Sequence, residues 1–323
     1  MILGITMGDA SGVGPELILK AYKNHEIDPN FIVIGDYVIL DYCNQLLNLK
    51  VPLRKISKAS DWSKNTLNVL DLNILKKEEL KIGEISKEAG YAAKKYVEKA
   101  TLLALDGKID AMVTLPMNKE ATRLSDEHFS GHTGFIADLC EETNYTMMLA
   151  SDQMIVTHVS THLSMKNAIE AVKTKRVYDV IKLTYDTLKR FNLNPKIAVS
   201  GLNPHAGENG SFGFEEINEI KPAVLQAKEE GINVEGPIAP DTVFIKAYKK
   251  QYDAVVCMYH DQGHIPMKLL DFEGGVNITL GLKVIRTSVD HGTAFDIAYK
   301  GIASTRSLVE AYKFALKLVS QKK

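Results

Sequence analysis

The sequence predicts an α/β fold built on a largely parallel β-sheet. Short apolar runs rich in β-branched residues alternate along the chain with amphipathic stretches of helical period. Strands that alternate with helices favour crossover connections and parallel pairing, so this order indicates a series of βαβ units. The chain has 323 residues, which is enough for one large domain or two ordinary ones.

The expected elements follow from these patterns in chain order. Strands are expected at residues 2–7, 31–35, 111–115, 154–159, 196–202, 254–259, 276–280 and 284–287. The clearest helix covers residues 88–106, because Ala92, Tyr96 and Ala100 fall on one stripe and Gly107 follows as a stop signal. Further helices are expected at residues 15–22, 167–191, 214–230 and 306–320.

Composition excludes several classes of protein. The 39 basic and 40 acidic side chains give a formal net charge of −1, and no basic block suggests a nucleic-acid binder. No apolar run approaches the roughly 18–20 residues of a membrane span, and no basic segment resembles a signal peptide. Cys43, Cys140 and Cys257 are odd in number and widely spaced, which is typical of core cysteines in a reducing compartment. We therefore expect a cytoplasmic protein that binds neither nucleic acid nor membrane.

Three histidines follow the ends of expected strands. His162, His205 and His260 come at or just past strands 154–159, 196–202 and 254–259. Ligands of α/β sheets bind at the carboxyl ends of strands, and three imidazoles with an open position suit a catalytic metal ion. The alternative is that each is a loop histidine bonded to backbone.

Two further histidines complicate this pattern. His158 precedes His162 by four residues and His264 follows His260 by four, a spacing that shares one face of a helix. Because residues 154–159 have strand composition and residues 261–263 are typical of a turn, we expect both to be structural.

Glycine-rich loops mark two other places. Residues 7–16 follow a strand and open a helix, which suits a ligand at a helix N-terminus or simply a tight turn. Their spacing matches neither the Rossmann nor the Walker fingerprint. The second loop, residues 206–213, precedes Glu215 and Glu216 and is expected to shape the metal site.

Polar and cationic side chains of the C-terminal half could hold an anion. Lys268 and Arg286 suit a phosphate or carboxylate, although each could equally be a surface ion pair. The segment 131–133 is either a polar ligand contact or the start of a helix.

Taken together, the motifs resemble the 4-hydroxythreonine-4-phosphate dehydrogenase family of vitamin B6 biosynthesis. The segments that carry the resemblance stand in order along nearly the whole chain: residues 8–16, 130–133, 161–163, 203–208, 240–242, 259–263 and 286–294. The resemblance implies oxidation of the 3-hydroxyl of 4-phosphooxy-L-threonine by NAD⁺ or NADP⁺, with one divalent ion, Zn, Mg or Co. The 3-oxo acid then loses CO₂ to give 3-amino-2-oxopropyl phosphate, which pyridoxine 5'-phosphate synthase uses.

The resemblance also assigns residues. It implies metal ligation by His162, His205 and His260, and substrate contacts from His132, Thr133, Lys268, Asn277 and Arg286. Residues 290–298 are similar to the cofactor-adenosine loop of decarboxylating dehydrogenases, which implies cofactor contacts from His291, Gly292 and Asp296. Asp241 and Asp261 are candidates for the general base, and the sequence does not rank them.

The implied architecture is that of isocitrate and isopropylmalate dehydrogenases, with two α/β/α domains around a cleft. One domain is expected at residues 1–125 with 285–323, and the second, carrying most ligands, at 126–284. The resemblance also implies a homodimer with its active site at the subunit interface. Ala10 and Tyr299 depart from the family pattern of proline and glycine, and Tyr299 leaves the choice between NAD and NADP open.

Other functions remain to be weighed. The nearest is a paralogous dehydrogenase of another phosphorylated four-carbon hydroxy acid. A metal-dependent phosphatase or aldolase could use the same histidines, but it leaves residues 290–298 without a role. A ligand-binding protein without catalysis is disfavoured by the histidines at strand ends.

Overall fold

The computed structural model describes residues 1–272 and 274–320, which form two compact units. Unit 1 comprises Met1–Thr143 together with residues 282–320, and unit 2 comprises Asn144–Gly281. Sequence analysis placed the first division after residue 125. The structure places it later, because helix α5 (His132–Leu139) packs against helix α3 (Lys87–Leu105) of unit 1.

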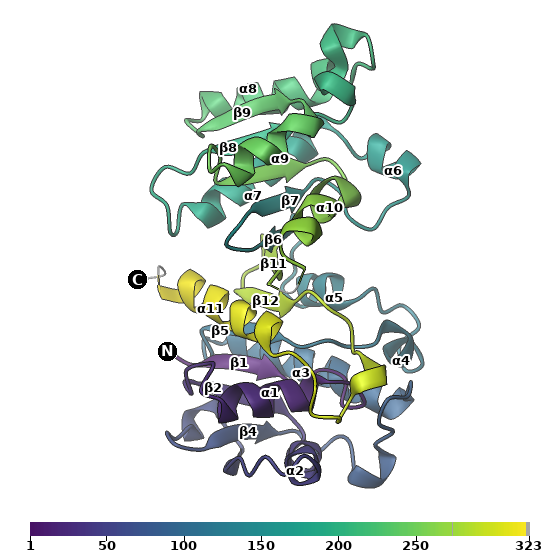
Figure 1. The fold of residues 1–323 in the computed structure, drawn as a ribbon, viewed down its shortest axis with the longest axis vertical. Helices are drawn as coiled ribbons and strands as arrows, with labels where there is room; N and C mark the ends of the chain where they lie inside the picture. The colour runs from purple at the N-terminus through teal and green to yellow at the C-terminus, as the bar shows by residue number, and fades with distance from the viewer. Residues whose placement is uncertain (273, 321–323) are drawn as a thin grey trace. The chain divides into compact units, whose positions relative to one another are not determined.

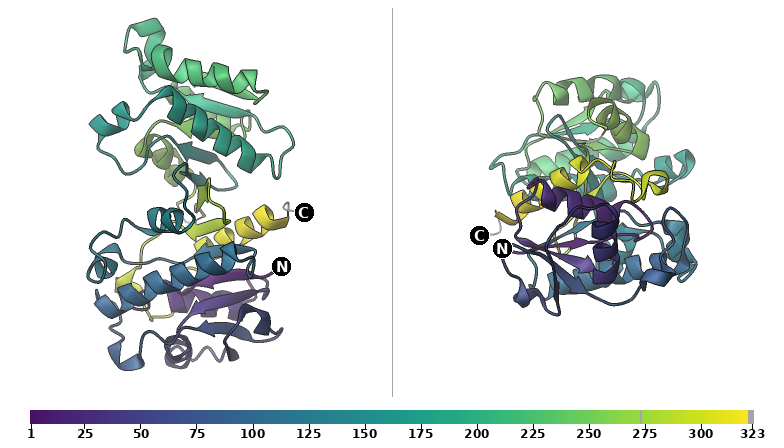
Figure 2. Two further views of the ribbon diagram at one scale, coloured as in Figure 1. Left: turned by 180° about the vertical axis from the view of Figure 1, so that it is seen from behind. Right: turned by 60° about the horizontal axis from the view of Figure 1, so that its bottom comes forward.

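Unit 1 is built on a parallel sheet. Its strand order is β3 (Leu53–Ile56), β4 (Leu67–Asp71), β2 (Phe31–Gly35), β1 (Leu3–Thr6), β5 (Ala111–Thr114) and β12 (Arg286–Val289). Helix α3 lies on one face, and α1 (Gly14–Lys23) and α11 (Arg306–Ser320) lie on the other (Figures 1 and 2). After β1 the chain first builds β2 on one side and later β5 on the other. The gap between β1 and β5 is therefore a topological switch point, where such sheets bind ligands.

The long helix of unit 1 has the predicted stripe. Ala92, Tyr96 and Ala100 are fully buried, and the Ser86 hydroxyl caps the first turn by accepting the Ala89 N–H at 3.3 Å. The Tyr96 hydroxyl donates to Asp36 Oδ2 at 2.7 Å, which joins α3 to the end of β2. The helix thus fixes the carboxyl edge of the sheet.

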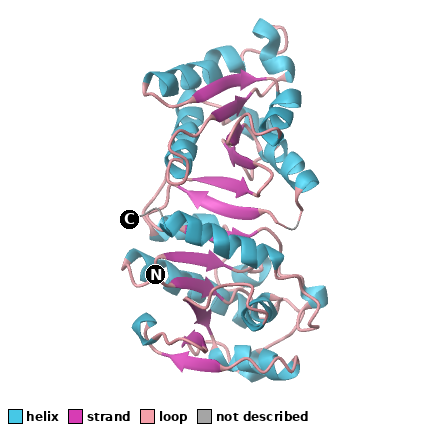
Figure 3. Ribbon diagram, turned by 60° about the vertical axis from the view of Figure 1, so that its left-hand side comes forward, coloured by secondary structure: helices cyan, strands magenta, loops and turns pink. Residues whose placement is uncertain are grey.

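Unit 2 has a mixed sheet. The order is β11 (Val276–Leu280), β6 (Thr146–Ala150), β7 (Ile155–His158), β10 (Ala254–Cys257), β8 (Ile197–Ser200) and β9 (Val234–Ile238). Strands β11, β6 and β7 pair antiparallel, whereas β7, β10, β8 and β9 pair in parallel. Helices flank the strands, as Figure 3 shows.

Alternate residues of β10 show how unit 2 buries both faces of its sheet. Ala254 and Val256 belong to a core shared with α7 (Thr174–Leu188) and α8 (Lys221–Glu229). Val255 and Cys257 belong to a second core, to which α9 (Pro240–Tyr248) and α10 (His260–Leu270) contribute. Because side chains alternate across a strand, a continuous apolar run is what a doubly covered strand requires.

Several elements differ from their predicted form. The helix expected at residues 167–191 is two helices, α6 (Met165–Glu170) and α7, because the Thr174 N–H is bound by the Glu219 carboxylate at 2.7 Å. The helix expected at 214–230 starts as the π-helical turn η4 (Glu216–Ile220) before α8, where Pro222 lacks an N–H. Strand β12 begins two residues later than expected. Strands β3, β4, β6 and β9 were missed.

The shorter helices complete the fold. They are α2 (Tyr37–Leu46) and α4 (Lys119–Arg123), with the single turns η1 (Ala59–Asp61), η2 (Lys77–Glu79), η3 (Pro204–Gly210) and η5 (Phe295–Ile297). Among the described residues, no helix combines the length and apolar composition that crossing a membrane would require.

Candidate active site

The three strand-end histidines of unit 2 follow neighbouring parallel strands. His162 lies in the loop after β7, and His205 lies in the turn η3 after β8. His260 is the first residue of helix α10, which follows β10. The ring centroids of His162 and His260 are 5.9 Å apart. Because β8 has β9 on one side and β10 on the other, the loops that carry His205 and His260 flank a topological switch point.

A buried amide joins these two loops. Gln262 is only 8% exposed; its Oε1 accepts the Met258 N–H at 2.7 Å, and its Nε2 donates to the Gly201 carbonyl at 2.8 Å. One side chain therefore fixes the end of β10 against the end of β8.

Carboxylates bind two of the imidazoles on their Nδ1 edges. His205 Nδ1 lies 3.1 Å from Glu208 Oε2, and His260 Nδ1 lies 2.6 Å from Asp261 Oδ1. Because the carboxylates contact Nδ1, Nε2 is the ring nitrogen that remains for a ligand, as in metal-binding histidines that are oriented by a carboxylate. Within residues 1–272 and 274–320, no group of three His, Cys, Asp or Glu side chains is close enough to hold an ion.

The structure corrects the local conformation expected around His264. Residues 261–263 form the first turn of α10 and not a loop, so His264 stacks on His260 with ring centroids 3.6 Å apart and planes inclined by 11°. Gly263 stands in this turn because a Cβ there would lie 2.4 Å from His158 Nε2. Close packing therefore accounts for the glycine that had suggested a turn.

His158 and His264 are buried, with ring centroids 4.7 Å apart. Burial lowers the pKa of His264 to about 4 and that of His158 to about 3, so both rings are neutral at pH 7. His264 Nδ1 lies 3.0 Å from the His260 carbonyl. No described residue forms a hydrogen bond with His158 Nε2. Both rings support the position of His260.

The two candidate bases differ in their surroundings. Asp261 contacts His260, so its carboxylate already accepts a hydrogen bond. Asp241 is exposed in the first turn of α9, a helix that packs against the turn η3. The geometry therefore gives Asp261 an orienting contact and leaves Asp241 at the edge of the histidine loops.

Cationic side chains of unit 1 lie near the start of α5. Arg286 is 3% exposed, and its Nε and Nη2 donate to Thr114 Oγ1 at 3.0 and 2.8 Å. Burial lowers the pKa of Arg286 to about 9, which keeps it mostly charged at pH 7. Burial, with Arg286 and Lys119 nearby, lowers the pKa of His132 to about 3. His132 Nε2 is buried without a partner.

The backbone at the start of α5 brings His132, Thr133 and Lys119 together. Gly131 caps the helix with φ 120°, a conformation that favours glycine, and His132 and Thr133 follow in the first turn. The Lys119 side chain crosses this point, with its Cε 2.9 Å from where a Cβ on Gly131 would lie. Helix N-terminus and cations together suit an anionic group. Sequence analysis missed Lys119, whose only signal is its place after the capping residue Asn118.

The other two predicted substrate residues belong to unit 2. Lys268 lies on α10, with its Nζ 5.6 Å from the ring centroid of Phe272. Asn277 lies on β11 opposite Leu149 of β6 and is half-buried. The structure thus groups His132, Thr133 and Arg286 within one unit and places these two in the other.

The predicted cofactor segment lies against the first glycine loop. The Val13 N–H donates to the Thr293 carbonyl at 3.0 Å, which holds residues 290–298 beside the loop before α1. His291, Gly292 and Asp296 are exposed on this segment, and no atom lies within 4 Å of the place a Cβ on Gly292 would take. The exposed segment is accessible to a ligand.

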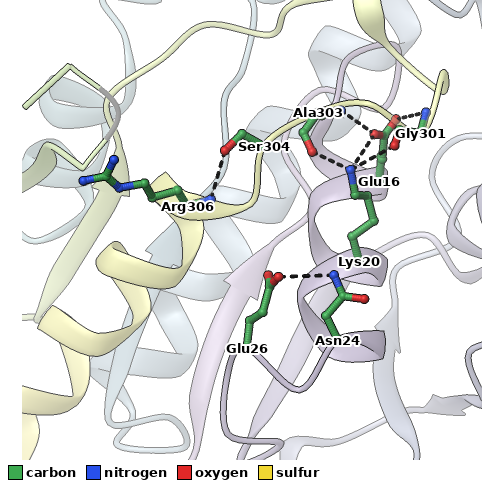
Figure 4. A network of polar contacts seen from close by, with 8 residues as sticks. All are labelled: Glu16, Lys20, Asn24, Glu26, Gly301, Ala303, Ser304 and Arg306. Atoms are coloured by element: carbon green, nitrogen blue, oxygen red, sulfur yellow. Dashed lines mark hydrogen bonds and ion pairs between the residues drawn. The ribbon is translucent and has the colours of Figure 1, made fainter.

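The two departures from the family pattern contact each other. The Tyr299 hydroxyl donates to the Ala10 carbonyl at 2.8 Å. Beyond Tyr299, the Glu16 carboxylate accepts the N–H groups of Gly301 and Ala303 at 3.0 and 2.8 Å, and Lys20 binds their carbonyls (Figure 4). Helix α1 therefore holds the chain that leaves the predicted cofactor segment.

Two buried polar atoms lie at the switch point of unit 1. Asp9 is fully buried, and its Oδ1 accepts the Ser11 N–H at 2.9 Å; within residues 1–272 and 274–320, Asp9 Oδ2 and Ser11 Oγ make no hydrogen bond of good geometry. Burial raises the pKa of Asp9 to about 6. This loop therefore carries a carboxyl group whose charge changes near neutral pH.

Comparison with known proteins places the chain among dehydrogenases. Residues 28–315 match the model of the family described as "Pyridoxal phosphate biosynthetic protein PdxA". D-threonate 4-phosphate dehydrogenases from Salmonella typhimurium and Cupriavidus necator are each 44% identical to it, covering 98% and 99% of the chain and 98% of their own length. The crystal structure of a 4-hydroxythreonine-4-phosphate dehydrogenase from Klebsiella pneumoniae is similar, with 40% identity, a TM-score of 0.89 and coverage of 98% and 99% of the two chains.

Proposed function

The chain belongs to the family of the pyridoxal phosphate biosynthetic protein PdxA and is a dehydrogenase of the 4-hydroxythreonine-4-phosphate dehydrogenase type, and from this premise we propose its reaction. It oxidises the 3-hydroxyl of a four-carbon acid phosphorylated at carbon 4, with NAD⁺ or NADP⁺ as hydride acceptor. The 3-oxo acid then loses its carboxyl group as CO₂. The observation that carries the proposal is the set of histidines after the neighbouring strands β7, β10 and β8.

Two substrates of this class are candidates. D-threonate 4-phosphate is the first, because relatives that match the chain over its whole length carry that name. The second is 4-phosphooxy-L-threonine, which the motifs and the names of the family and of the similar structure favour. The two molecules share the carboxylate, the 3-hydroxyl and the phosphate, and differ in a hydroxyl or an amine at carbon 2. Decarboxylation would give dihydroxyacetone phosphate from the first and 3-amino-2-oxopropyl phosphate from the second.

The residue types at the three strand ends of unit 2 suit a divalent cation, although the described side chains do not gather into a group of three ligands in this structure. His162, His205 and His260 would hold it, and the carboxylates on the Nδ1 atoms of His205 and His260 support ligation through Nε2. When bound, Zn²⁺, Co²⁺ or Mg²⁺ supplies Lewis acidity, which favours loss of the hydroxyl proton and stabilises negative charge on that oxygen during decarboxylation.

The protein side chains have separate tasks. Arg286 and Lys119 hold an anionic group of the substrate at the start of α5, where Thr133 adds a hydroxyl. His132 is neutral, so its unpartnered Nε2 accepts a hydrogen bond from a substrate hydroxyl. Lys268 and Asn277 bind the remaining polar groups. Asp241 or Asp261 takes the hydroxyl proton as the hydride leaves carbon 3.

The remaining parts of the proposal follow the resemblance. Residues His291, Gly292 and Asp296 contact the cofactor, on the segment that lies beside the glycine loop. The enzyme is a cytoplasmic homodimer with its active site at the subunit interface and an architecture like isocitrate and isopropylmalate dehydrogenases. With 4-phosphooxy-L-threonine as substrate, the product would pass to pyridoxine 5'-phosphate synthase.

A substrate comparison tests the proposal. The purified enzyme is mixed with each candidate substrate and each cofactor, and reduced cofactor and CO₂ are measured together. We expect both to appear in equal amounts, with higher kcat/KM for D-threonate 4-phosphate. Chelation should abolish turnover and a divalent metal should restore it. Turnover by a metal-free His205→Ala variant at the rate of the native enzyme would refute the metal site, and oxidation without CO₂ would refute the decarboxylation.

A further inference from the structure

We propose that Glu216 is a positioning residue that fixes the turn carrying His205, so that the His205 imidazole is placed for metal ligation. This inference rests on the proposed metal site and adds a residue that none of the motifs assigns.

The turn that carries His205 has an unusual backbone. His205, Ala206, Glu208 and Asn209 all have φ between 40° and 54°, and Gly207 between them has φ 78°. A left-handed conformation is unfavourable for residues with a Cβ, by about 1–2 kcal/mol each. A run of such residues therefore persists only where surrounding contacts hold it, and such strain is often found at functional sites.

Glu216 provides those contacts from the next element. It is the first residue of the π-helical turn η4 and is 3% exposed. Its Oε1 accepts the N–H groups of Leu202 and Asn203, both at 2.7 Å, and its Oε2 accepts the Asn203 side-chain amide at 2.9 Å. The carboxylate thus binds the chain at the point where it leaves β8 and enters the turn.

The same carboxylate also contacts the middle of the turn. A Cβ on Gly207 would lie 2.7 Å from Glu216 Oε2, so only glycine allows the backbone to approach this closely. Glu216 therefore touches the chain on both sides of His205, at residues 202–203 and at Gly207. The imidazole between them is exposed; its Nδ1 lies 3.1 Å from Glu208 Oε2, and its ring meets the Phe212 ring edge-on with centroids 5.8 Å apart.

The consequence is a fixed relation between two histidine loops. Gln262 joins Gly201, just before the turn, to Met258, just before His260. Glu216 continues this connection from Leu202 into the turn. If Glu216 lost one acceptor oxygen, the turn could relax from its left-handed form, and His205 would move relative to His260.

The substitution Glu216→Gln tests this step. The amide keeps the size of the side chain but puts an NH₂ group where an oxygen now accepts an N–H. Glu219→Gln is the matched control, because Glu219 lies in the same turn and accepts the Thr174 N–H and hydroxyl at 2.7 and 2.8 Å, away from His205. Co²⁺ binding to the full-length metal-free protein is followed by its visible absorption and by competition with a chelator, and thermal unfolding of the metal-free protein is measured in parallel.

We expect Glu216→Gln to weaken Co²⁺ binding about 10–100-fold, the usual effect of removing a group that orients a ligand, and to alter the Co²⁺ spectrum. Glu219→Gln should bind Co²⁺ like the native protein. In a His205→Ala background, Glu216→Gln should cause no further loss, because the residue it positions is gone. Asn203→Ala removes one donor to Glu216 and, with it, the bond of the same amide to Glu215 Oε2 at 2.7 Å, and it should give a smaller loss of the same kind. If Glu216→Gln does not fold, Asn203→Ala decides the matter by comparison with Glu215→Ala, which loses the Glu215 contact alone.

Other outcomes would overturn the inference. Equal Co²⁺ affinity of Glu216→Gln and Glu219→Gln would show that the turn holds its shape without the carboxylate. An undiminished effect of Glu216→Gln in the His205→Ala background would show that Glu216 acts elsewhere. If the native protein bound no Co²⁺, or His205→Ala left its affinity unchanged, the metal site itself would be wrong, and the role of Glu216 would fail with it.

Discussion

At the scale of single residues, burial decides the charge of the groups that the proposed reaction uses. The sequence identified His132 and Arg286, but it could not show that His132 is neutral and Arg286 charged at pH 7, since burial and neighbouring cations set both pKa values. Sequence analysis likewise could not find the unpartnered Nε2 of His132 or Oδ2 of Asp9, which become visible only after packing. Residue types were predictable, whereas their protonation was not.

Removing the charge of Arg286 should weaken substrate binding selectively. The guanidinium is buried and held by Thr114, so Arg286→Met leaves the helix N-terminus with less positive charge. Losing hydrogen bonds between charged groups is worth about 1.5–3 kcal/mol, which corresponds to roughly a 10–100-fold rise in the substrate Kd. Calorimetry would measure substrate and cofactor binding separately, with the exposed Arg54→Met as control. Equal losses of both affinities would contradict the assignment.

Asp9 should make stability depend on pH in the direction opposite to most carboxylates. Its pKa is about 6 in the folded chain and about 3.8 when unfolded, so the native state binds the proton more tightly. Protonation of Asp9 therefore contributes fully to the free energy of unfolding below about pH 4. This contribution is lost as pH rises through 6, and the loss amounts to at most about 3 kcal/mol. Asp9→Asn should remove this loss. Urea unfolding of the native protein, of Asp9→Asn and of the control Asp152→Asn, at an exposed position, measures this loss between pH 4 and 8. Parallel curves of unfolding free energy against pH for all three proteins would disprove the role of Asp9.

At the scale of elements, the hydrophobic pattern of the sequence predicted strands best where both faces of the strand are buried. Strand β1 was predicted from its apolar run, and all four of its residues, Leu3–Thr6, are buried, which accounts for both faces. Strand β3 was missed because it lies at the sheet edge with Arg54 and Lys55 exposed. Helix α10 was taken for a turn because Gly263 is a common turn residue, and its tertiary reason, the His158 ring, is distant in sequence.

Gly263→Ala distinguishes these two explanations of the glycine. If Gly263 were merely a helix residue with open space, alanine would stabilise α10 by about 1 kcal/mol. The structure instead predicts destabilisation by about 1–3 kcal/mol, because the new Cβ would lie 2.4 Å from His158 Nε2 and 3.1 Å from Cys257 Sγ. Urea unfolding compares the Gly263→Ala protein with Gly292→Ala, where an added Cβ would have no described atom within 4 Å. A gain in stability would mean that His158 and α10 can separate freely.

At the scale of the whole chain, the net charge of −1 agrees with the proposal that a few placed cations, and not a broadly positive surface, bind the anionic substrate. Positive charge is placed at the start of α5, where Arg286 and Lys119 act beside His132. The sequence motifs named His132, Arg286 and the three strand-end histidines as candidates, but they placed the first chain division 18 residues too early relative to Thr143. Helix contacts, which composition does not reveal, decide that boundary.

The path of the chain predicts that unit 2 folds by itself. It is one continuous insertion into unit 1, from Asn144 to Gly281, and its ends are joined because Thr146 of β6 pairs with Leu280 of β11. Both of its apolar cores consist of residues from this insertion alone. A domain with adjacent ends and its own core generally folds when excised.

A protein of residues 144–281 should therefore unfold cooperatively in urea and give a dispersed NMR spectrum. The substitution Val256→Ala, which removes methyl groups from one of these cores, should lower its free energy of unfolding by about 1–3 kcal/mol. The same substitution should have a similar effect in the full chain, since the packing around Val256 would be unchanged. A collapsed spectrum without cooperative unfolding, or a substitution that alters only the full chain, would show that unit 1 is needed to complete the fold of unit 2.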